Sequence, residues 1–370
     1  MKRRFLWLII LVLMMSLAAC GKEQTAGEGN NVSGDLAEEE SPEHSYAARK
    51  PVSCADFTSK IIRLGEYKGL SAVRTVVEIT DEDVEREIRE IKKQYGQLTE
   101  VDRPAEMGDV VLIDYIGYVD GETIEALQGT GDELELGSGR FVPGFEEQLV
   151  GVQSGTECEI NLTFPEDYYE EVAGKDVRFQ VKVECISSYE VENWESGFIR
   201  ENLQYEDEVQ LRASIREELE HSAEADADAA LEYELVKALL AGSEFDVQQP
   251  DVEAYIDEIV SEYEMYAAIY QMSLEEYLKS FQMTEEQLRD LCRESADFRV
   301  RMVLALQAVA SEEELEVTEE ECQVKVHELA EEYGYSDPAA VEAVYSREVL
   351  KEQMRQERAL TFIVENAVIS

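Results

Sequence analysis

The sequence predicts an α+β protein in which strands and helices occupy separate stretches of the chain. From about residue 101 to 189, apolar and polar residues alternate with a period of two and glycines interrupt the alternation, which is typical of antiparallel strands joined by tight turns. From about residue 191 onward glycine is rare and apolar residues recur at helical spacing. This segregation favours an antiparallel sheet domain followed by a separate all-helical domain.

The first 20 residues have the pattern of a secretory signal and are excluded from the fold. A basic start, residues 2–4, precedes an apolar run, residues 5–15, that is too short to span a bilayer. The run ends in Leu-Ala-Ala-Cys, which resembles the lipobox of bacterial lipoproteins, in which the cysteine carries the lipid. We therefore expect Cys20 to be lipidated and the protein to be held on the outer face of a bacterial cell membrane. The alternative is an ordinary cleaved signal with a chance cysteine.

The chain is predicted to divide into five parts. Residues 21–50 contain almost no large apolar side chain and cannot bury enough surface to offset the entropy cost of ordering, so we expect a disordered tether. A flexible chain of roughly 30 residues reaches roughly 30 Å. The predicted parts are the signal 1–20, the tether 21–50, a strand and helix linker 51–100, the sheet domain 101–190 and the helical domain 191–370.

Residues 51–100 are predicted to contain a strand followed by a helix. The stretch "SAVRTVVEI", residues 71–79, is rich in β-branched residues and favours a strand. Thr80 followed by Asp83 is typical of a helix N-cap, and apolar residues follow it at helical spacing. These apolar residues are Val84, Ile88, Ile91 and Tyr95.

Turn signals in the sheet domain indicate a short helix held between strands. Asp120-Gly121 between two alternating runs is a hairpin signal, because glycine accepts the positive φ of a primed turn. The stretch "RFVPGFEEQLVG" predicts a short helix with Pro143 near its first turn and Gly151 just past its end. A short helix against a bent antiparallel sheet leaves an apolar pocket between them.

These residues resemble a known family. The stretches "GDVVLIDYIGYVDGE", "LGSGRFVPGFEEQLVGVQSG" and "TFPEDYY" are similar to the FKBP-type peptidyl-prolyl isomerase domain, in the version found in the bacterial chaperone trigger factor. "LGEYKGL", "VTEEECQVKVHELAEEYG" and "LKEQMRQERALTFIVENAVI" resemble other parts of trigger factor, so the resemblance covers roughly residues 60–370. It implies an FKBP-like sheet wrapped on a short helix over 101–190 and a helical chaperone domain over 191–370. The ribosome-binding domain of trigger factor, with its "GFRKGK"-like loop, has no counterpart in this sequence, so no ribosome is expected as a partner.

The resemblance implies an apolar, aromatic site for proline. Rotation about an amide breaks its resonance, and the twisted amide is less polar than either planar form, so a dry pocket favours it without an acid, base or nucleophile. By motif, Tyr115 supplies one wall, Phe141 and Val142 line the side, Phe145 forms the floor and Phe179 closes the far side. A backbone N–H near Phe141 and Val142 is expected to donate to the substrate carbonyl. Each ring also has an interpretation as plain core.

Three further residues complete the predicted site. Tyr168 in "PEDYY" is expected on the loop over the pocket. Ile124 stands where the family usually has phenylalanine, and Glu125 is the acid that follows it. Because isoleucine lacks a ring face, we expect weak activity, and a non-catalytic pocket that only binds proline-containing segments stays open as an alternative.

The helical third of the chain predicts paired helices. Long amphipathic patterns cover residues 209–241, 251–271, 284–310 and 318–333, and the last two begin with threonine followed by acidic residues. Pro250 precedes the second pattern. Apolar residues left over after helix pairing are candidates for an adaptable client-binding surface, with inter-helix core as the alternative interpretation. Methionines are among these residues: Met265, Met272, Met283 and Met302.

Charge limits the partners. The 370 residues include 33 basic and 83 acidic ones, a formal net charge of −50, which argues against nucleic acid and against attraction to anionic lipid. The carboxylates are interpreted as a solvated, self-repelling surface, and a preference for basic clients is the alternative.

Cysteines and histidines give no sign of a cofactor. Besides Cys20 there are five cysteines without CxxC spacing, and alternation predicts that Cys158 and Cys185 face the sheet core. A bridge between these two, or between Cys292 and Cys322, is left open. The three histidines lack ligand spacing, and no phosphate-binding, dinucleotide or nucleophile-elbow motif is present, so no metal or cofactor is expected.

Together these features predict a membrane-anchored, extracytoplasmic foldase. It is expected to isomerise X-Pro bonds and to hold unfolded or proline-containing secreted polypeptides. The alternative is a non-catalytic holdase whose isomerase domain has become a scaffold. A solute-binding lipoprotein would need two α/β lobes, which the segregation of strands and helices disfavours.

Overall fold

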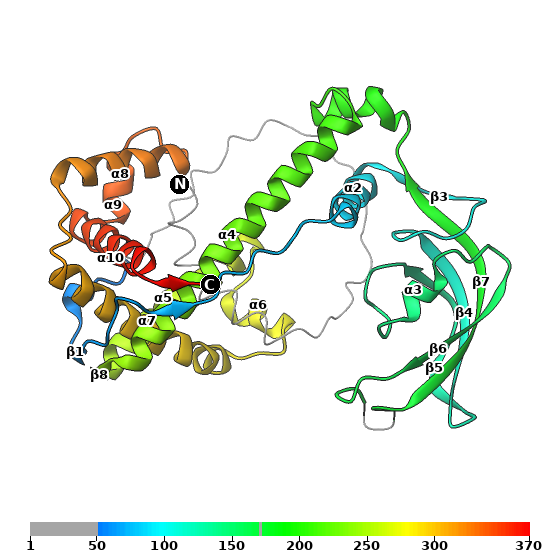
Figure 1. Cartoon of the computed structure of the whole chain (residues 1–370), viewed down its shortest axis with the longest axis horizontal. Coiled ribbons are helices and arrows are strands. Elements are labelled where there is room, and N and C mark those ends of the chain that lie inside the picture. The colour runs from blue at the N-terminus through cyan, green and yellow to red at the C-terminus, as the bar shows by residue number, and fades with distance from the viewer. Residues whose placement is uncertain (1–50, 170–171) are drawn as a thin grey trace. The chain divides into compact units, whose positions relative to one another are not determined.

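The computed structural model describes residues 51–169 and 172–370, which form two compact units (Figure 1). The sheet unit comprises residues 77–224, and the helical unit comprises residues 51–76 and 225–370. The predicted signal, the tether and Cys20 lie outside the described residues. Helix α4 (Glu208–Gly242) contributes residues to both units.

These units divide the chain differently from the predicted parts. The segment predicted as a linker over 51–100 is split, because residues 51–76 belong to the helical unit and 77–100 to the sheet unit. Helix α2 (Asp81–Tyr95) buries Ile88 against Ile199 of the π-helix η2 (Trp194–Leu203) and Leu211 of α4. This small core explains why residues 191–224, predicted as part of the helical domain, belong to the sheet unit.

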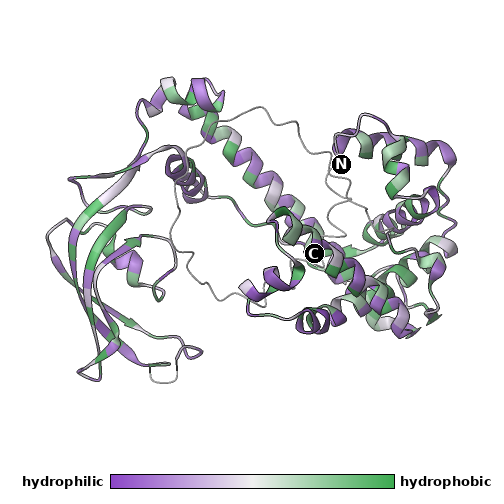
Figure 2. Cartoon of the chain, turned by 180° about the vertical axis from the view of Figure 1, so that it is seen from behind, coloured by the Kyte–Doolittle hydropathy of each residue, from purple (hydrophilic) through white to green (hydrophobic). Residues whose placement is uncertain are grey.

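The sheet unit is built on a five-stranded antiparallel sheet, as predicted. The strand order is β3-β7-β4-β5, and β6 pairs with the other end of β7, along the same sheet. Polar and apolar residues alternate along its strands (Figure 2). The strands are β3 (Gln97–Glu100), β4 (Val110–Val119), β5 (Glu122–Glu135), β6 (Glu157–Thr163) and β7 (Asp176–Glu190).

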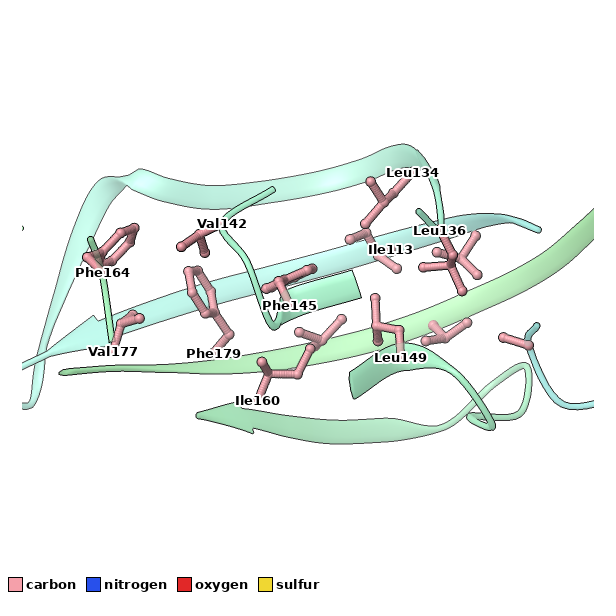
Figure 3. Packing of buried hydrophobic residues seen from close by; sticks show 14 of the residues in the cluster. Ile113, Leu134, Leu136, Val142, Phe145, Leu149, Ile160, Phe164, Val177 and Phe179 are labelled. Atoms are coloured by element: carbon pink, nitrogen blue, oxygen red, sulfur yellow. The ribbon is translucent and has the colours of Figure 1, made fainter. Parts of the chain in front are cut away.

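A short helix, α3 (Phe145–Leu149), packs on this sheet and closes its core. Figure 3 shows Val142, Phe145 and Phe179 grouped in the space that the strands and α3 enclose. The hairpin turn is confirmed, since Asp120 and Gly121 have φ of 54° and 86°. Pro143, expected near the first turn of the helix, lies two residues before its start.

The two sheet cysteines differ in their environment. Cys158 packs against the core as predicted, but the prediction for Cys185 is wrong. The β4–β7 register shifts between Leu112 and Ile113, so the buried position passes from Val183 to Ile186 and Cys185 is left half-buried at the bulge. All five cysteines in the described residues are free thiols.

Most of the strand predicted over 71–79 does not form. Only β2 (Ser71–Ala72) pairs, in parallel with β9 (Val368–Ile369). The following residues, among them Val73 and Val77, are exposed and have no strand beside them in the part of the chain that the structure describes. β-branched residues favour a strand only where a partner strand is available.

The predicted helix caps are confirmed. Thr80 caps α2 through a reciprocal pair of hydrogen bonds with Asp83, and Thr284 and Thr318 cap the helices that follow them in the same way. Each of the four long predicted helices lies within two residues of an observed one at both ends. The remaining helical elements are the short 3-10 helix η1 (Cys54–Asp56), α5 (Gln249–Ile269), α6 (Leu274–Ser280), α7 (Glu285–Glu312), α8 (Glu319–Glu332), α9 (Ala339–Val344) and α10 (Arg347–Glu365).

The helical unit has two large cores that share α7. One joins α4, α7 and α10, and the other joins α5, α6 and α7. No described helix is both long enough and apolar enough to cross a bilayer. A two-stranded sheet of β1 (Lys60–Arg63) and β8 (Glu244–Asp246) lies beside the first core.

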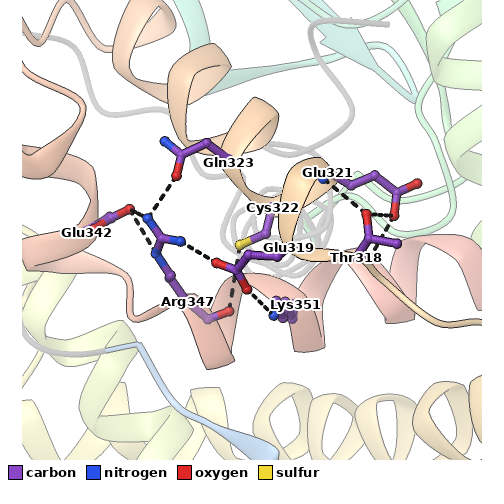
Figure 4. A network of polar contacts seen from close by, with 8 residues as sticks. All are labelled: Thr318, Glu319, Glu321, Cys322, Gln323, Glu342, Arg347 and Lys351. Atoms are coloured by element: carbon purple, nitrogen blue, oxygen red, sulfur yellow. Dashed lines mark hydrogen bonds and ion pairs between the residues drawn. The ribbon is translucent and has the colours of Figure 1, made fainter.

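Charged groups fix α8 and α9 to α10 (Figure 4). The Arg347 guanidinium donates to Glu319, Glu342 and Gln323, and Lys351 lies 2.6 Å from the same Glu319. These contacts surround a small apolar core between the three helices. Because most of the charges are partly exposed, they set the arrangement of the helices more than they add stability.

Residues 51–59 are tied to the helical unit by a buried carboxylate. Asp251, 6% exposed at the start of α5, accepts hydrogen bonds from the backbone N–H of Ser59 at 2.6 Å and of Thr58 at 3.0 Å. Burial alone would raise the pKa of Asp251, but the hydrogen bonds from Ser59 and Thr58 outweigh it and lower that pKa below its ordinary value.

We predict a pH-dependent loss of stability in Asp251→Asn. A carboxyl with a lowered folded-state pKa stabilises the protein above its unfolded-state pKa, and this stabilisation disappears as the pH falls through the lower folded-state value. The variant should lose about 1–3 kcal/mol of unfolding free energy at pH 7 and progressively less below about pH 4. Urea unfolding, followed by circular dichroism at pH 7 and at pH 3, measures this loss of unfolding free energy. The exposed control on the same helix, Glu264→Gln, should change stability little; an equal loss at pH 7 and pH 3 would contradict the account.

Candidate functional site

Four aromatic rings meet in the core of the sheet unit. Phe145 of α3 lies 4.4 Å from Phe141 and 5.1 Å from Phe179 of β7, between ring centroids. Tyr115 of β4 lies 5.2 Å from Phe141 and 6.2 Å from each of the other two. The structure thus brings together four of the residues predicted to form the site, and we call these four rings the aromatic cluster.

Two glycines allow the rings to lie close to the backbone. A Cβ on Gly117 would lie 2.8 Å from Cε1 of Phe179, and one on Gly129 would lie 2.5 Å from Cε1 of Tyr115. Neither ring could keep its place beside a larger residue. Gly117 on β4 and Gly129 on β5 therefore leave the space that the rings of Phe179 and Tyr115 occupy.

A buried carboxylate fixes the loop that precedes α3. Glu146, 4% exposed, accepts hydrogen bonds from the backbone N–H of Gly137 at 2.8 Å, Gly139 at 3.1 Å and Phe141 at 3.0 Å. The sequence predicted that a backbone N–H near Phe141 and Val142 binds the substrate carbonyl. The N–H of Phe141 already donates to Glu146, so it is not available for that bond. The N–H of Val142 has none among the described residues, so it is the donor that stays available.

The cluster is closed in this structure. Phe145 has no exposed surface and Phe179 is 2% exposed, so both pack as core, while Phe141 and Tyr115 are half-buried. Phe141 stacks on Phe145 with 22° between the ring planes. The residue predicted as the floor of the pocket is therefore covered by the residue predicted as its side.

The other predicted site residues lie around the cluster. Ile124 on β5 is half-buried and packs against the core, and Glu125 beside it is exposed. Tyr168 is 42% exposed and stacks on Phe164 at 5.0 Å, so its ring extends the core and contacts no ring of the aromatic cluster.

Two residues of the site were missed from the sequence. Burial raises the pKa of Tyr115, and the neighbouring Asp132 carboxylate raises it further. On β5, Asp132 has the same parity as the buried Leu134, and Leu136, one residue past the end of the strand, is buried too; this signal could have placed Asp132 on the inner face. Glu146 had a weaker signal, an acid at the first turn of a short helix that follows glycine-rich chain.

A second candidate surface lies in the helical unit, around the junction of α5, α6 and α7. We call it the helical tip. It has a hollow of about 420 Å³ whose lining includes Phe281, Met283 and Leu291. Large apolar side chains, each more than a third exposed, gather there: Met265, Tyr266, Ile269, Tyr270, Met272, Phe281 and Leu291.

The four methionines named from the sequence divide between the two interpretations. Met265 and Met272 are exposed at the helical tip, whereas Met302 is 7% exposed and belongs to the core of α4, α7 and α10. Met283 is half-buried against the core of α5 and α7. A methionine stripe therefore does not by itself mark a binding surface in this chain.

Comparison with known proteins decides the family. The model of the FKBP-type peptidyl-prolyl cis-trans isomerase matches residues 101–184, and that of the bacterial trigger factor C-terminus matches residues 209–365. Trigger factor of Bacillus cereus (strain Q1) is 35% identical over 323 residues, which cover 84% of this chain and 75% of the relative. The chain belongs to the trigger factor family. Trigger factor of Bacillus thuringiensis (strain Al Hakam) matches with the same identity and coverage.

The family assignment confirms the resemblance predicted from the sequence. The protein is a trigger factor-like chaperone with an FKBP-type isomerase domain and a helical C-terminal domain. A solved structure of the trigger factor chaperone, described for promiscuous substrate recognition in folding and assembly, aligns over 88% of this chain and 81% of its own at 18% identity and a TM-score of 0.33.

Proposed function

We propose that this protein is a membrane-anchored extracytoplasmic foldase that isomerises X-Pro bonds and holds unfolded secreted polypeptides. The observation that supports isomerisation is the aromatic cluster next to the N–H of Val142, which has no acceptor among the described residues. The rings supply an apolar surface for a proline side chain, and the N–H supplies a donor for a peptide carbonyl. Both are the groups that the isomerisation needs.

The chemistry needs no charged catalyst. The barrier to rotation about a peptide bond is about 18–20 kcal/mol because the planar amide is stabilised by resonance. The twisted amide has lost that resonance and is less polar than the planar amide. An apolar site therefore lowers the free energy of the twisted form relative to the planar form, compared with water. The N–H of Val142 would hold one substrate carbonyl in place while the neighbouring X-Pro bond turns. The backbone of the loop, fixed by Glu146, would keep this N–H oriented.

We predict that Phe145→Ala strongly weakens isomerisation. Loss of the central ring removes contact with proline, and kcat/KM in a protease-coupled X-Pro peptide assay should fall by about tenfold or more. The change also costs stability, so Leu149→Ala serves as control. Leu149 lies on the same helix and is equally buried, and both variants lose about 2–5 kcal/mol. Unchanged activity in folded Phe145→Ala would favour the non-catalytic holdase.

The helical tip supports the holdase part of the proposal. Its exposed aromatic and methionine side chains form an apolar surface that folding has left uncovered, and its hollow has room for a side chain of a client. Tyr277 lies between Tyr270, at 6.1 Å, and Phe281, at 5.3 Å, so the rings form a continuous aromatic strip. Such a surface binds apolar segments without strict sequence requirements.

We predict that the double variant Tyr270→Ser, Phe281→Ser weakens client holding. It removes two of the most exposed rings of the helical tip, and a several-fold higher concentration should be needed to suppress aggregation of a chemically unfolded protein, measured by light scattering. The control is Tyr333→Ser, Tyr335→Ser, which removes two exposed rings near the end of α8. Equal suppression by both variants would contradict a holding role for the helical tip, while isomerase activity should stay unchanged in both.

The proposed location rests on the sequence. The basic start, short apolar run and Leu-Ala-Ala-Cys ending support export and lipidation at Cys20. Lipid chains contribute about 0.8 kcal/mol per buried methylene, so two or more hold a protein firmly on a membrane. An anionic membrane surface repels a protein with a net charge of −50, so electrostatic attraction could not replace a lipid anchor.

We predict that Cys20→Ser releases the protein from the membrane. In a bacterial host, the wild-type protein should incorporate labelled palmitate and sediment with membranes, and the variant should do neither. Cys54→Ser, another cysteine in the N-terminal part of the chain, is the control and should behave as the wild type. A wild-type protein found unlabelled in the soluble cytosolic fraction would contradict the proposed location.

A further inference from the structure

We propose that Phe141 competes with the substrate proline for the face of Phe145 and must turn away before the substrate binds. The inference rests on the proposed isomerase function, and it concerns the step that precedes catalysis. A ring that only formed a pocket wall would strengthen substrate binding. The ring of Phe141 would instead weaken it, because in the resting state this ring covers Phe145.

The geometry of the rings distinguishes Phe141 from its neighbours. Phe179 meets Phe145 at 90° and Tyr115 meets it at 75°, so neither ring stacks parallel to it. Phe141 lies nearly parallel to Phe145, with 4.4 Å between centroids and 22° between planes. A proline ring that packs on an aromatic face would need the place that Phe141 now fills.

The burial of the two rings supports the same conclusion. Phe145 has no exposed surface, whereas Phe141, which stacks on it, is half-buried, and the Arg140 guanidinium lies 5.7 Å from the Phe141 ring centroid. Phe141 is therefore the more exposed of the two stacked rings. Turning this one side chain outward would expose the face without unpacking α3 or the sheet.

The backbone restricts the motion to that side chain. The N–H of Phe141 is held by Glu146, which also holds Gly137 and Gly139, so the loop cannot open without breaking hydrogen bonds to a buried carboxylate. A rotation of χ1 breaks none of them. The N–H of Val142 would keep its position during the rotation.

Because only open molecules bind, the apparent affinity should equal the affinity of the open form multiplied by the fraction of molecules that are open. If one molecule in about ten is open, the apparent Kd for a proline peptide is about tenfold higher than that of the open form. Removing the competing ring should therefore tighten binding. If Phe141 is instead a wall of an open pocket, its removal should weaken binding.

The sign of the change in Kd for Phe141→Ala tests this inference. The probe is the blocked tetrapeptide Ala-Leu-Pro-Phe, titrated into the full protein and followed by NMR. Phe141→Ala should bind at least about threefold more tightly than the wild type. Ile116→Ala removes a half-exposed aliphatic side chain of β4 outside the cluster and should leave Kd unchanged. Weaker binding by Phe141→Ala would overturn the inference.

A measurement on the wild type does not depend on how the variant folds. Peptide binding should replace the NOEs between Phe141 and Phe145 with NOEs between the peptide proline and Phe145. If the proline contacts Phe145 while the NOEs between the two rings persist, the inference is wrong although the proposed function stands. If neither protein binds the peptide and the wild type does not isomerise it, the proposed function fails and the inference fails with it.

Discussion

The candidate site depends on one buried carboxylate. Helix α3 has only five residues, too few to hold itself together in water, and the loop before it is rich in glycine. Glu146 accepts three backbone N–H groups from that loop, and Phe145 and Leu149 on either side of it are fully buried. A carboxylate can be buried in this way only because it is fully hydrogen-bonded. The positions of Phe141 and of the Val142 N–H, for which the described part of the chain offers no acceptor, follow from that arrangement.

Each unit offers a different kind of surface to an unfolded chain. In the sheet unit, the proposed surface is the aromatic cluster, in which Phe141 stacks on the fully buried Phe145. In the helical unit, the helical tip is open and carries exposed methionine and aromatic side chains. This division agrees with the proposed function, in which one unit holds clients and the other acts on their prolines.

Local rules predicted local structure well. Thr80 and Asp83 identified the start of α2, Asp120-Gly121 identified the hairpin, and the period of apolar residues located the long helices, because these signals depend on neighbours in the sequence. They failed where long-range pairing decides. The β-branched residues after Ala72 found no partner strand, and a bulge beside Leu112 turned Cys185 away from the core. Motif resemblance named four rings that meet in the structure, but neither the bond from Phe141 to Glu146 nor the stacking of Phe141 on Phe145 has a signal in the sequence.

Hydrogen exchange of three backbone amides tests the central constraint most directly. In the wild type, the amides of Gly137, Gly139 and Phe141 should be protected from exchange although they lie in a loop near the surface. In Glu146→Gln all three should exchange at least about tenfold faster, since a neutral amide accepts weaker hydrogen bonds than a carboxylate, and the neighbouring exposed variant Glu147→Gln should leave them protected. Equal protection of the three amides in Glu146→Gln and the wild type would contradict the account.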